Sequence, residues 1–303
     1  MGVLRILAVP VSFFYFLFSK RSRTESKRFL QKVSVFIKDG KTAKKCVSCF
    51  GPLRVIVSFS LCLLERLESW NGTFPFSAVH FKGDGPGDLV RGLENGKGAF
   101  IICSHLGNTE LLRALASFNK TGVSRNIRVT SIVDFSVTSR FNRMLWELNP
   151  QSRLSVIGAD EIGPHTAPLL EERLAGGELV VIAGDRTPAA GDKAPYDFPF
   201  LGEHAPFAFG SFYLASLLNY PVYFVFALRH DGGLFKKDYD MYIHKSGVSF
   251  DCPRSERLKR SEKLARLFAL TLESHCKKYP FQWYNFHDFW ADKTCGPETA
   301  GGF

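Results

Sequence analysis

A histidine and a glutamate stand five positions apart where a short apolar run gives way to a helical pattern. His105 and Glu110 follow the run AFIIC at residues 99–103. On one continuous helix, a spacing of five leaves the two side chains about 140° apart, unlike the four-residue spacing of a zinc-binding pair. With His105 in a turn, Glu110 can hydrogen-bond one ring nitrogen and leave the other free as a general base. The pair therefore predicts proton transfer to and from a substrate.

Motifs that supply a protein nucleophile or a phosphate-binding loop do not occur in the sequence, which has no G-x-S-x-G, no P-loop and no complete G-x-G-x-x-G. Cys46 and Cys49 form a lone C-x-x-C pair without the second pair that a zinc site needs. The seven cysteines are odd in number and lack framework spacing, which favours a reducing compartment. We expect no metal and no cofactor, and a substrate hydroxyl or amine as the nucleophile.

The elements around this pair predict an α/β fold. We expect strands at residues 77–81, 99–103, 127–133, 154–158, 178–183, 221–228 and 239–244, and helices at 88–95, 109–118, 137–148, 166–175, 209–218 and 255–277. This alternation indicates a single domain at 73–291, with a mixed, largely parallel sheet flanked by helices, and a flexible tail at 292–303. Asn108 is a suitable N-cap for the helix expected at 109–118, so His105 falls in a strand-to-helix turn, where such sheets bind ligands.

The first 72 residues predict a membrane-anchoring helical segment in front of the domain. Residues 1–20 are an apolar anchor, because the run at 3–18 is apolar apart from Arg5 and is broken by Pro10. Sixteen residues fall short of the roughly 20 that span a bilayer, so spanning and lying in the membrane both stay open. Residues 21–72 are basic and amphipathic, with an amphipathic helix expected at 52–67 that ends in charged residues.

The distribution of charge favours binding to a membrane surface over binding to nucleic acid. Ten Lys or Arg residues stand against two acidic residues between Lys20 and Lys45, a surplus of eight in a chain of net charge +10. Basic residues after an apolar segment favour its cytoplasmic side and attract anionic headgroups. No RNP, KH or helix-turn-helix pattern appears, so we expect no nucleic-acid partner. The alternative is that both apolar segments are core helices of a soluble protein.

Four ordered pieces of the chain resemble the lysophospholipid-acyltransferase superfamily, and more closely its bacterial lipid A late-acyltransferase (lauroyl/myristoyl) branch. They are the H-x-x-x-x-E pair, ELVVIAGDRTP at 178–188, FPFLGEHAPFAFGSFYLASLLNYPVYFVFALR at 198–229 and YPFQWYNFHDFW at 279–290. The N-terminal apolar segment fits too, so the resemblance covers residues 3–290. It implies a membrane-associated acyltransferase at the cytoplasmic face of a bacterial inner membrane.

The resemblance implies that His105 is the base, that Glu110 is its partner and that Asp185 is a polar-site residue. The donor would be a thioester of acyl carrier protein or coenzyme A, and the acceptor a hydroxyl or amine of a membrane lipid or glycolipid. Backbone N–H groups after Gly107, or an arginine, would stabilise the oxyanion. Asn108, Arg140, Arg143 and Arg186 are the expected substrate-binding residues.

Departures from the branch indicate a divergent subfamily. A Tyr-Arg-Pro-like element is replaced by VDFSVTSRFNRML at 133–145, so either Arg140 or Arg143 could take the place of its arginine. Arg186 is not the usual residue after Asp185, and the closing motif lacks an Arg-Arg pair. A thioester hydrolase that uses the same His/Glu pair, and a non-catalytic membrane lipid-binding protein, remain as alternatives.

Overall fold

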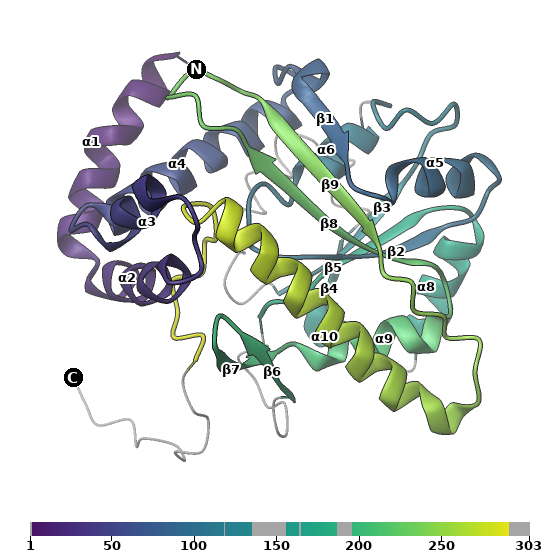
Figure 1. The fold of residues 1–303 in the computed structure, drawn as a ribbon. Helices are drawn as coiled ribbons and strands as arrows, with labels where there is room; N and C mark the ends of the chain where they lie inside the picture. The colour runs from purple at the N-terminus through teal and green to yellow at the C-terminus, as the bar shows by residue number, and fades with distance from the viewer. Residues whose placement is uncertain (1, 118, 135–155, 164, 187–195, 291–303) are drawn as a thin grey trace, which may run out of the picture.

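A seven-stranded mixed sheet forms the centre of the protein. The computed structural model describes residues 2–117, 119–134, 156–163, 165–186 and 196–290 (Figure 1). The sheet order is β1-β9-β8-β2-β5-β3-β4. The strands are β1 (Val79–Lys82), β2 (Ala99–Cys103), β3 (Val129–Val133), β4 (Val156–Gly158), β5 (Leu179–Ala183), β8 (Val222–Arg229) and β9 (Tyr239–Lys245).

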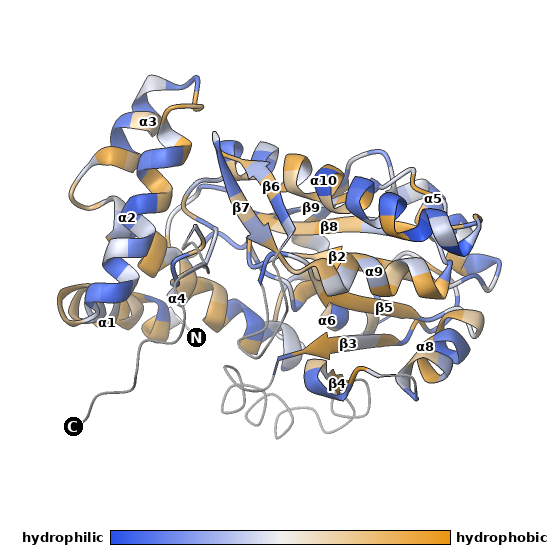
Figure 2. Cartoon of the chain, turned by 90° about the horizontal axis from the view of Figure 1, so that it is seen from below, coloured by the Kyte–Doolittle hydropathy of each residue, from blue (hydrophilic) through white to orange (hydrophobic). Residues whose placement is uncertain are grey.

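Parallel pairing dominates this sheet, as the sequence predicts. Only β8 and β9 pair antiparallel, and every other neighbouring pair is parallel. All five residues of β2 are buried, which is why this strand is a continuous apolar run instead of an alternating one. Figure 2 shows β2, β5 and β3 as the apolar centre of the molecule. The expected α/β class is therefore confirmed, and all seven strands expected from the sequence are present.

Helices cover both faces of the sheet. On one face, α5 (Pro86–Glu94) and α6 (Leu111–Ser117) contribute to a cluster with Ile101 and Tyr223. On the other face, α8 (Thr166–Ala175), α9 (Phe209–Leu218) and the long α10 (Arg254–Lys278) enclose a cluster centred on Phe268. Because side chains alternate along β2, Ile101 lies in the first cluster and Ile102 in the second. Residues 137–148, where a helix is expected, lie outside the described residues, as does the expected tail.

A short hairpin was not expected from the sequence. Strands β6 (Tyr196–Phe200) and β7 (Glu203–Phe207) pair antiparallel around a two-residue turn. Both turn residues, Leu201 and Gly202, have positive φ values of 51° and 83°, as a type I′ hairpin turn requires. Each of the two strands contains a proline, and because proline usually argues against a strand, the sequence pattern does not predict this hairpin.

Four helices precede the sheet and lie together at one side of it (Figures 1 and 2). They are α1 (Gly2–Phe18), α2 (Lys20–Ser34), α3 (Gly40–Val47) and α4 (Gly51–Trp70). None of the helices in the described ranges is by itself long and apolar enough to cross a bilayer. The pairs α1–α2 and α3–α4 meet the length and composition criteria only jointly, and each pair is bent by 95°.

Helix α1 is inverted relative to an ordinary surface helix. Its buried residues are Arg5, Ala8 and Ser12. Its exposed residues include eleven large apolar ones, namely Val3, Leu4, Ile6, Leu7, Val9, Val11, Phe13, Phe14, Tyr15, Leu17 and Phe18. Ser12 Oγ lies 2.8 Å from Ser60 Oγ of α4. The polar stripe of α1 therefore faces the protein, and its apolar surface faces outward.

Buried ion pairs attach α1 to α4. Arg5 contacts Glu65 at 2.9 Å and Glu68 at 2.6 Å, and all three side chains are almost fully buried. Arg229 lies 3.1 Å from Glu65, and Lys237 lies 2.9 Å from Glu68. Glu65 and Glu68, two of the charged residues expected at the end of the amphipathic helix, are thus buried, and cations from α1, from the end of β8 and from the segment after β8 neutralise them.

Candidate functional site

The imidazole of His105 is held by the carboxylate of Asp185. His105 Nδ1 lies 2.8 Å from Asp185 Oδ1, and the backbone N–H of His105 donates to Asp185 Oδ2 at 2.8 Å. The indole of Trp283 also donates to Oδ2, at 3.0 Å. Asp185 is fully buried, whereas the His105 side chain is 29% exposed. A fixed carboxylate thus orients an imidazole that a ligand can reach.

Neighbouring parallel strands bring these two residues together. Cys103, the last residue of β2, is in register with Ala183, the last residue of β5. Since His105 and Asp185 each come two residues later, they leave the same edge of the sheet at the same level. That edge, at the carboxyl ends of parallel strands, is where α/β sheets bind ligands.

Electrostatics keep Asp185 ionised. Burial alone would raise the pKa of Asp185, but the charge of His105 and hydrogen bonds from His105 and Trp283 outweigh burial and lower this pKa to about 2. Burial lowers the pKa of His105, and the charges of Arg186 and Arg66 lower it further, against the opposing effect of Asp185. His105 is therefore neutral near pH 7, which is the state that a general base requires.

The C-terminal segment fixes the loop that carries His105. Tyr284 N–H donates to His105 O, and Gly107 N–H donates to Gln282 O. The Gln282 side chain bonds both the N–H and the C=O of Arg229 at the end of β8. The closing aromatic motif at 279–290 therefore holds the loop that carries His105 in place.

Glycine is required at position 107. Gly107 has a φ of +80°, and a Cβ at this position would lie 2.0 Å from Ala227 O. Asn108 N–H donates to the same Ala227 carbonyl at 2.8 Å. The loop thus passes too close to β8 for any other residue at position 107.

Glu110 does not orient His105, contrary to the expectation from the sequence. Its carboxylate accepts a hydrogen bond from Arg113 at 2.9 Å, and the guanidinium of Arg113 lies over the Trp70 ring. Helix α6 begins at Leu111 and not at residue 109, so Glu110 lies in the preceding turn. Because Asp185 already occupies Nδ1 of His105, the orienting role belongs to Asp185.

The expected arginines have different positions. Arg186 lies beside the site, where its Nη2 donates to Tyr284 O at 3.1 Å and its charge acts on His105. Arg140 and Arg143 lie outside the described residues. Arg66 of α4 was not expected near the site, but it acts electrostatically on His105 and donates to Thr109 Oγ1 at 3.3 Å. The signal for Arg66 was its place among the charges that end the helix at 52–67.

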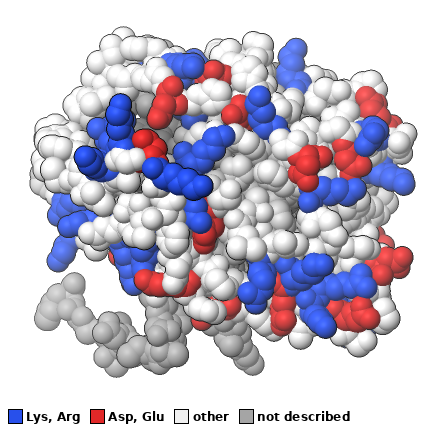
Figure 3. All heavy atoms as spheres, viewed as in Figure 1, with Lys and Arg blue, Asp and Glu red and all other residues white. Residues whose placement is uncertain are grey.

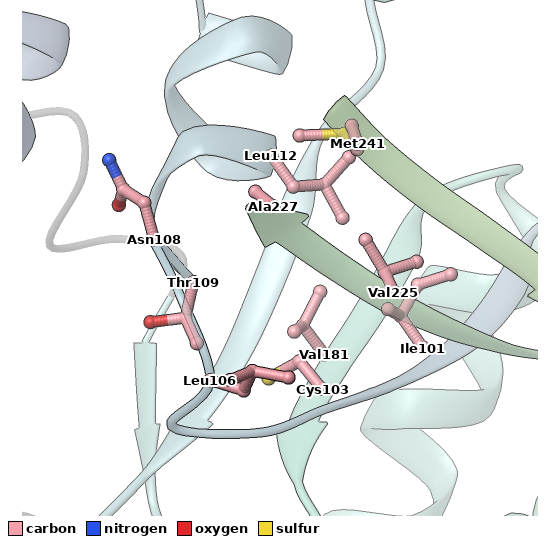
Figure 4. Close-up of a pocket in the computed structure, with 10 residues that line it drawn as sticks. All are labelled: Ile101, Cys103, Leu106, Asn108, Thr109, Leu112, Val181, Val225, Ala227 and Met241. Atoms are coloured by element: carbon pink, nitrogen blue, oxygen red, sulfur yellow. The ribbon is translucent and has the colours of Figure 1, made fainter. Parts of the chain in front are cut away.

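Asn108 is fully buried, and neither amide atom of its side chain has a hydrogen-bond partner among the residues that the structure describes. It is not a side-chain cap of α6, because such a cap would accept a backbone N–H. In Figure 4 its amide points away from the apolar side chains of a small cavity next to the loop. This cavity, about 10 Å³ in volume and lined by Ile101, Leu112 and Met241, has room for at most one water and none for an acyl chain.

Comparisons with known proteins add no functional evidence. No family model and no curated protein sequence matches this chain. The evidence for the chemistry of the site therefore lies in its own residues. Within the described ranges, no group of three or more His, Cys, Asp or Glu side chains is arranged to hold a metal ion.

Proposed function

We propose that this protein is a membrane-associated acyltransferase of the lysophospholipid-acyltransferase type, resembling the lipid A late-acyltransferase branch. The observation that carries the proposal is the His105–Asp185 pair at the carboxyl edge of the sheet. A neutral imidazole with Nδ1 bound to a carboxylate presents Nε2 as a base and gains stabilisation once it is protonated. The ordered pieces that resemble the branch, from H-x-x-x-x-E to the closing aromatic motif, favour acyl transfer among base-catalysed reactions.

In the proposed mechanism, Nε2 of His105 takes the proton of an acceptor hydroxyl or amine. The acceptor attacks the thioester carbonyl, and the carbonyl electron pair moves to oxygen. Collapse of this intermediate breaks the C–S bond, and the thiolate leaves with the proton from His105. Asp185 stabilises the imidazolium in between, and no step needs a covalent acyl-enzyme.

A nucleophile from the protein is disfavoured by its surroundings. Cys103 is the nearest thiol in the sequence, but burial and the charge of Asp185 raise its pKa far above the ordinary value. Ser104 is buried, and its Oγ accepts a hydrogen bond from Leu106 N–H. A substrate hydroxyl or amine therefore remains the better nucleophile, which favours transfer to an acceptor over an acyl-enzyme route.

The outer surface of α1 supports a membrane location, which we propose to be the cytoplasmic face of a bacterial inner membrane. Eleven exposed apolar side chains on one helix form an unusually large patch for a soluble surface. Figure 3 shows an uncharged surface at the upper left, where α1 lies, with Lys and Arg side chains next to it. We propose that α1 lies in the membrane plane, because Arg5 and Ser12 hold its polar stripe against α4.

The test is acceptor-dependent release of thiol from a dodecanoyl thioester of coenzyme A or acyl carrier protein. Vesicles of bacterial inner-membrane lipid supply the acceptor, and mass spectrometry identifies acylated lipid. The proposal expects thiol release and acylated lipid from the wild-type protein, and neither from a folded His105→Ala variant. Thiol release without an acylated product would show a thioester hydrolase instead.

A further inference from the structure

The oxyanion of the proposed reaction needs a hydrogen-bond donor, and the backbone N–H groups of residues 105–108 are already bonded to protein acceptors. The N–H of His105 donates to Asp185, and that of Leu106 donates to Ser104 Oγ. The N–H of Gly107 donates to Gln282 O, and that of Asn108 donates to Ala227 O. These four consecutive N–H groups are thus occupied by protein acceptors, so the backbone donors expected after Gly107 do not include the N–H of Asn108.

One side chain of the same loop has an unused donor. Asn108 is fully buried, and within the described ranges both Nδ2 and Oδ1 lack a hydrogen-bond partner. Leaving a buried amide without hydrogen bonds destabilises a fold. The backbone N–H of Asn108 is bonded to Ala227 O, and its side-chain amide adds no hydrogen bond to the described part of the loop. An unpaired amide at this position is therefore better explained by a ligand than by the fold.

The amide of Asn108 points to the same side as the hydroxyl that Arg66 contacts. In Figure 4 the polar ends of Asn108 and Thr109 point to the same side, away from the apolar cavity. Arg66, whose charge acts on His105, contacts the Thr109 hydroxyl on that side. The Asn108 amide thus points toward the side from which a cation already acts on the imidazole.

We propose that Asn108 is a catalytic residue whose Nδ2–H donates to the oxyanion formed when the acceptor attacks the thioester; this assignment rests on the proposed acyltransferase function. As the new O–C or N–C bond forms, the carbonyl electron pair moves to oxygen, and this oxyanion accepts a hydrogen bond from Nδ2–H. When the C–S bond breaks, the pair returns to re-form C=O, and the sulfur takes the proton from His105. The amide is enclosed by protein in the free enzyme, so neighbouring groups have to move for the substrate carbonyl to reach it, and the donor then acts in a medium of low dielectric constant, where it has its largest effect.

The test compares two substitutions at position 108. Asn108→Leu has a similar shape without polar atoms, and Asn108→Asp keeps the shape but replaces the donor with an acceptor. Both variants are expected to lower kcat for thiol release from the dodecanoyl thioester by about 10²–10³-fold. Binding of the non-reactive ketone analogue of dodecanoyl-coenzyme A is expected to change little, since the donor acts on the oxyanion more than on the ground-state carbonyl.

Thermal unfolding separates a catalytic role from a structural one. Because the Asn108 amide makes no hydrogen bond to the described part of the chain, Asn108→Leu is expected to keep or raise the melting temperature while activity falls. Ser26→Ala, which removes a buried unpartnered hydroxyl on α2, is the control and is expected to leave kcat unchanged.

Three outcomes would overturn the assignment. Wild-type-like kcat in the Leu and Asp variants would exclude Asn108 as the donor, and a loss of kcat in Arg66→Met alone would transfer that role to Arg66. A lowered melting temperature of Asn108→Leu that accounts for the lost activity would make Asn108 structural. A wild-type protein that releases no thiol from either thioester would instead contradict the proposed function, and the assignment with it.

Discussion

Two fully buried carboxylates in this protein have opposite kinds of partners. Asp185 faces an imidazole, an indole N–H and a backbone N–H, and only the imidazole can change its charge. Glu65 faces the permanent charges of Arg5 and Arg229 and the hydroxyl of Tyr239. Asp185 thus lies beside a group that can carry a proton, whereas Glu65 is neutralised by cations whose charge does not change. The first arrangement suits catalysis, and the second suits the attachment of one helix to another.

The residues around Asp185 and those around Glu65 also differ in solvent exposure. His105 is 29% exposed, whereas Arg5 is 2% exposed. A ligand can therefore reach the partner of Asp185 but not the main partner of Glu65. Substitutions in the two clusters should accordingly change different measured quantities.

The largest expected effect is on catalysis. Asp185→Asn keeps the shape of the side chain but removes the charge that stabilises protonated His105, and we expect acyl transfer to fall by about 10²–10⁴-fold. Glu110→Gln is the matched control, because Glu110 pairs with Arg113, and its effect is expected to be at least tenfold smaller. Steady-state rates of thiol release measure both. A greater loss in Glu110→Gln would return the orienting role to Glu110.

Glu65→Gln is expected to affect stability instead. It leaves Arg5 and Arg229 buried without their shared carboxylate, and losing one partner of a buried ion pair costs about 3–5 kcal/mol. Denaturant unfolding would measure the loss, and protein that remains folded should keep its rate of acyl transfer. If stability is unchanged while the rate collapses, the distinction between the two carboxylates fails.

Trp283→Phe should have a moderate effect that depends on pH. The folded pKa of Asp185, about 2, lies below its ordinary value of 3.8, so its ionised form adds stability above about pH 4, and this stability is lost as the pH falls toward 2. Removing the Trp283 donor raises the folded pKa and reduces this stability. We expect unfolding measured at pH 7 to show a loss of about 1–2 kcal/mol that shrinks near pH 2. A loss of equal size at both pH values would attribute it to packing alone.

The smallest expected effect concerns α1. Replacing exposed Phe14 and Leu17 with serine removes outward apolar surface without touching Arg5. We expect binding to anionic phospholipid vesicles to weaken by about tenfold, with unchanged stability. Leu258→Ser, an exposed substitution on α10, is the control. Equal vesicle binding by all three proteins would argue against α1 as the membrane surface.

The fold was largely predictable from local pattern. Seven apolar runs indicated seven strands, because buried parallel strands need continuous apolar residues. The polar stripe of α1 was also visible, since Arg5, Ala8 and Ser12 follow the spacing of one helix face. It was overlooked because the average composition of the segment is apolar.

The candidate site was only half predictable, because its pairing depends on strand order. Sequence spacing placed His105 in the turn after β2, but it could not show that β5 is the neighbour of β2. Only that pairing brings Asp185, 80 residues later in the chain, to the imidazole. Glu110 was favoured since it is near in sequence, and Arg66 was missed because its helix lies outside the sheet.

The most direct test of the account is the pKa of His105, measured by NMR titration in the wild-type protein, Asp185→Asn and Glu110→Gln. Burial, Arg186 and Arg66 lower this pKa below 6.5, while Asp185 opposes them. The account predicts a wild-type pKa below 6.5, a still lower one in Asp185→Asn, and no change in Glu110→Gln. A pKa that moves in Glu110→Gln and stays fixed in Asp185→Asn would contradict the assignment of Asp185 as the residue that orients the catalytic base.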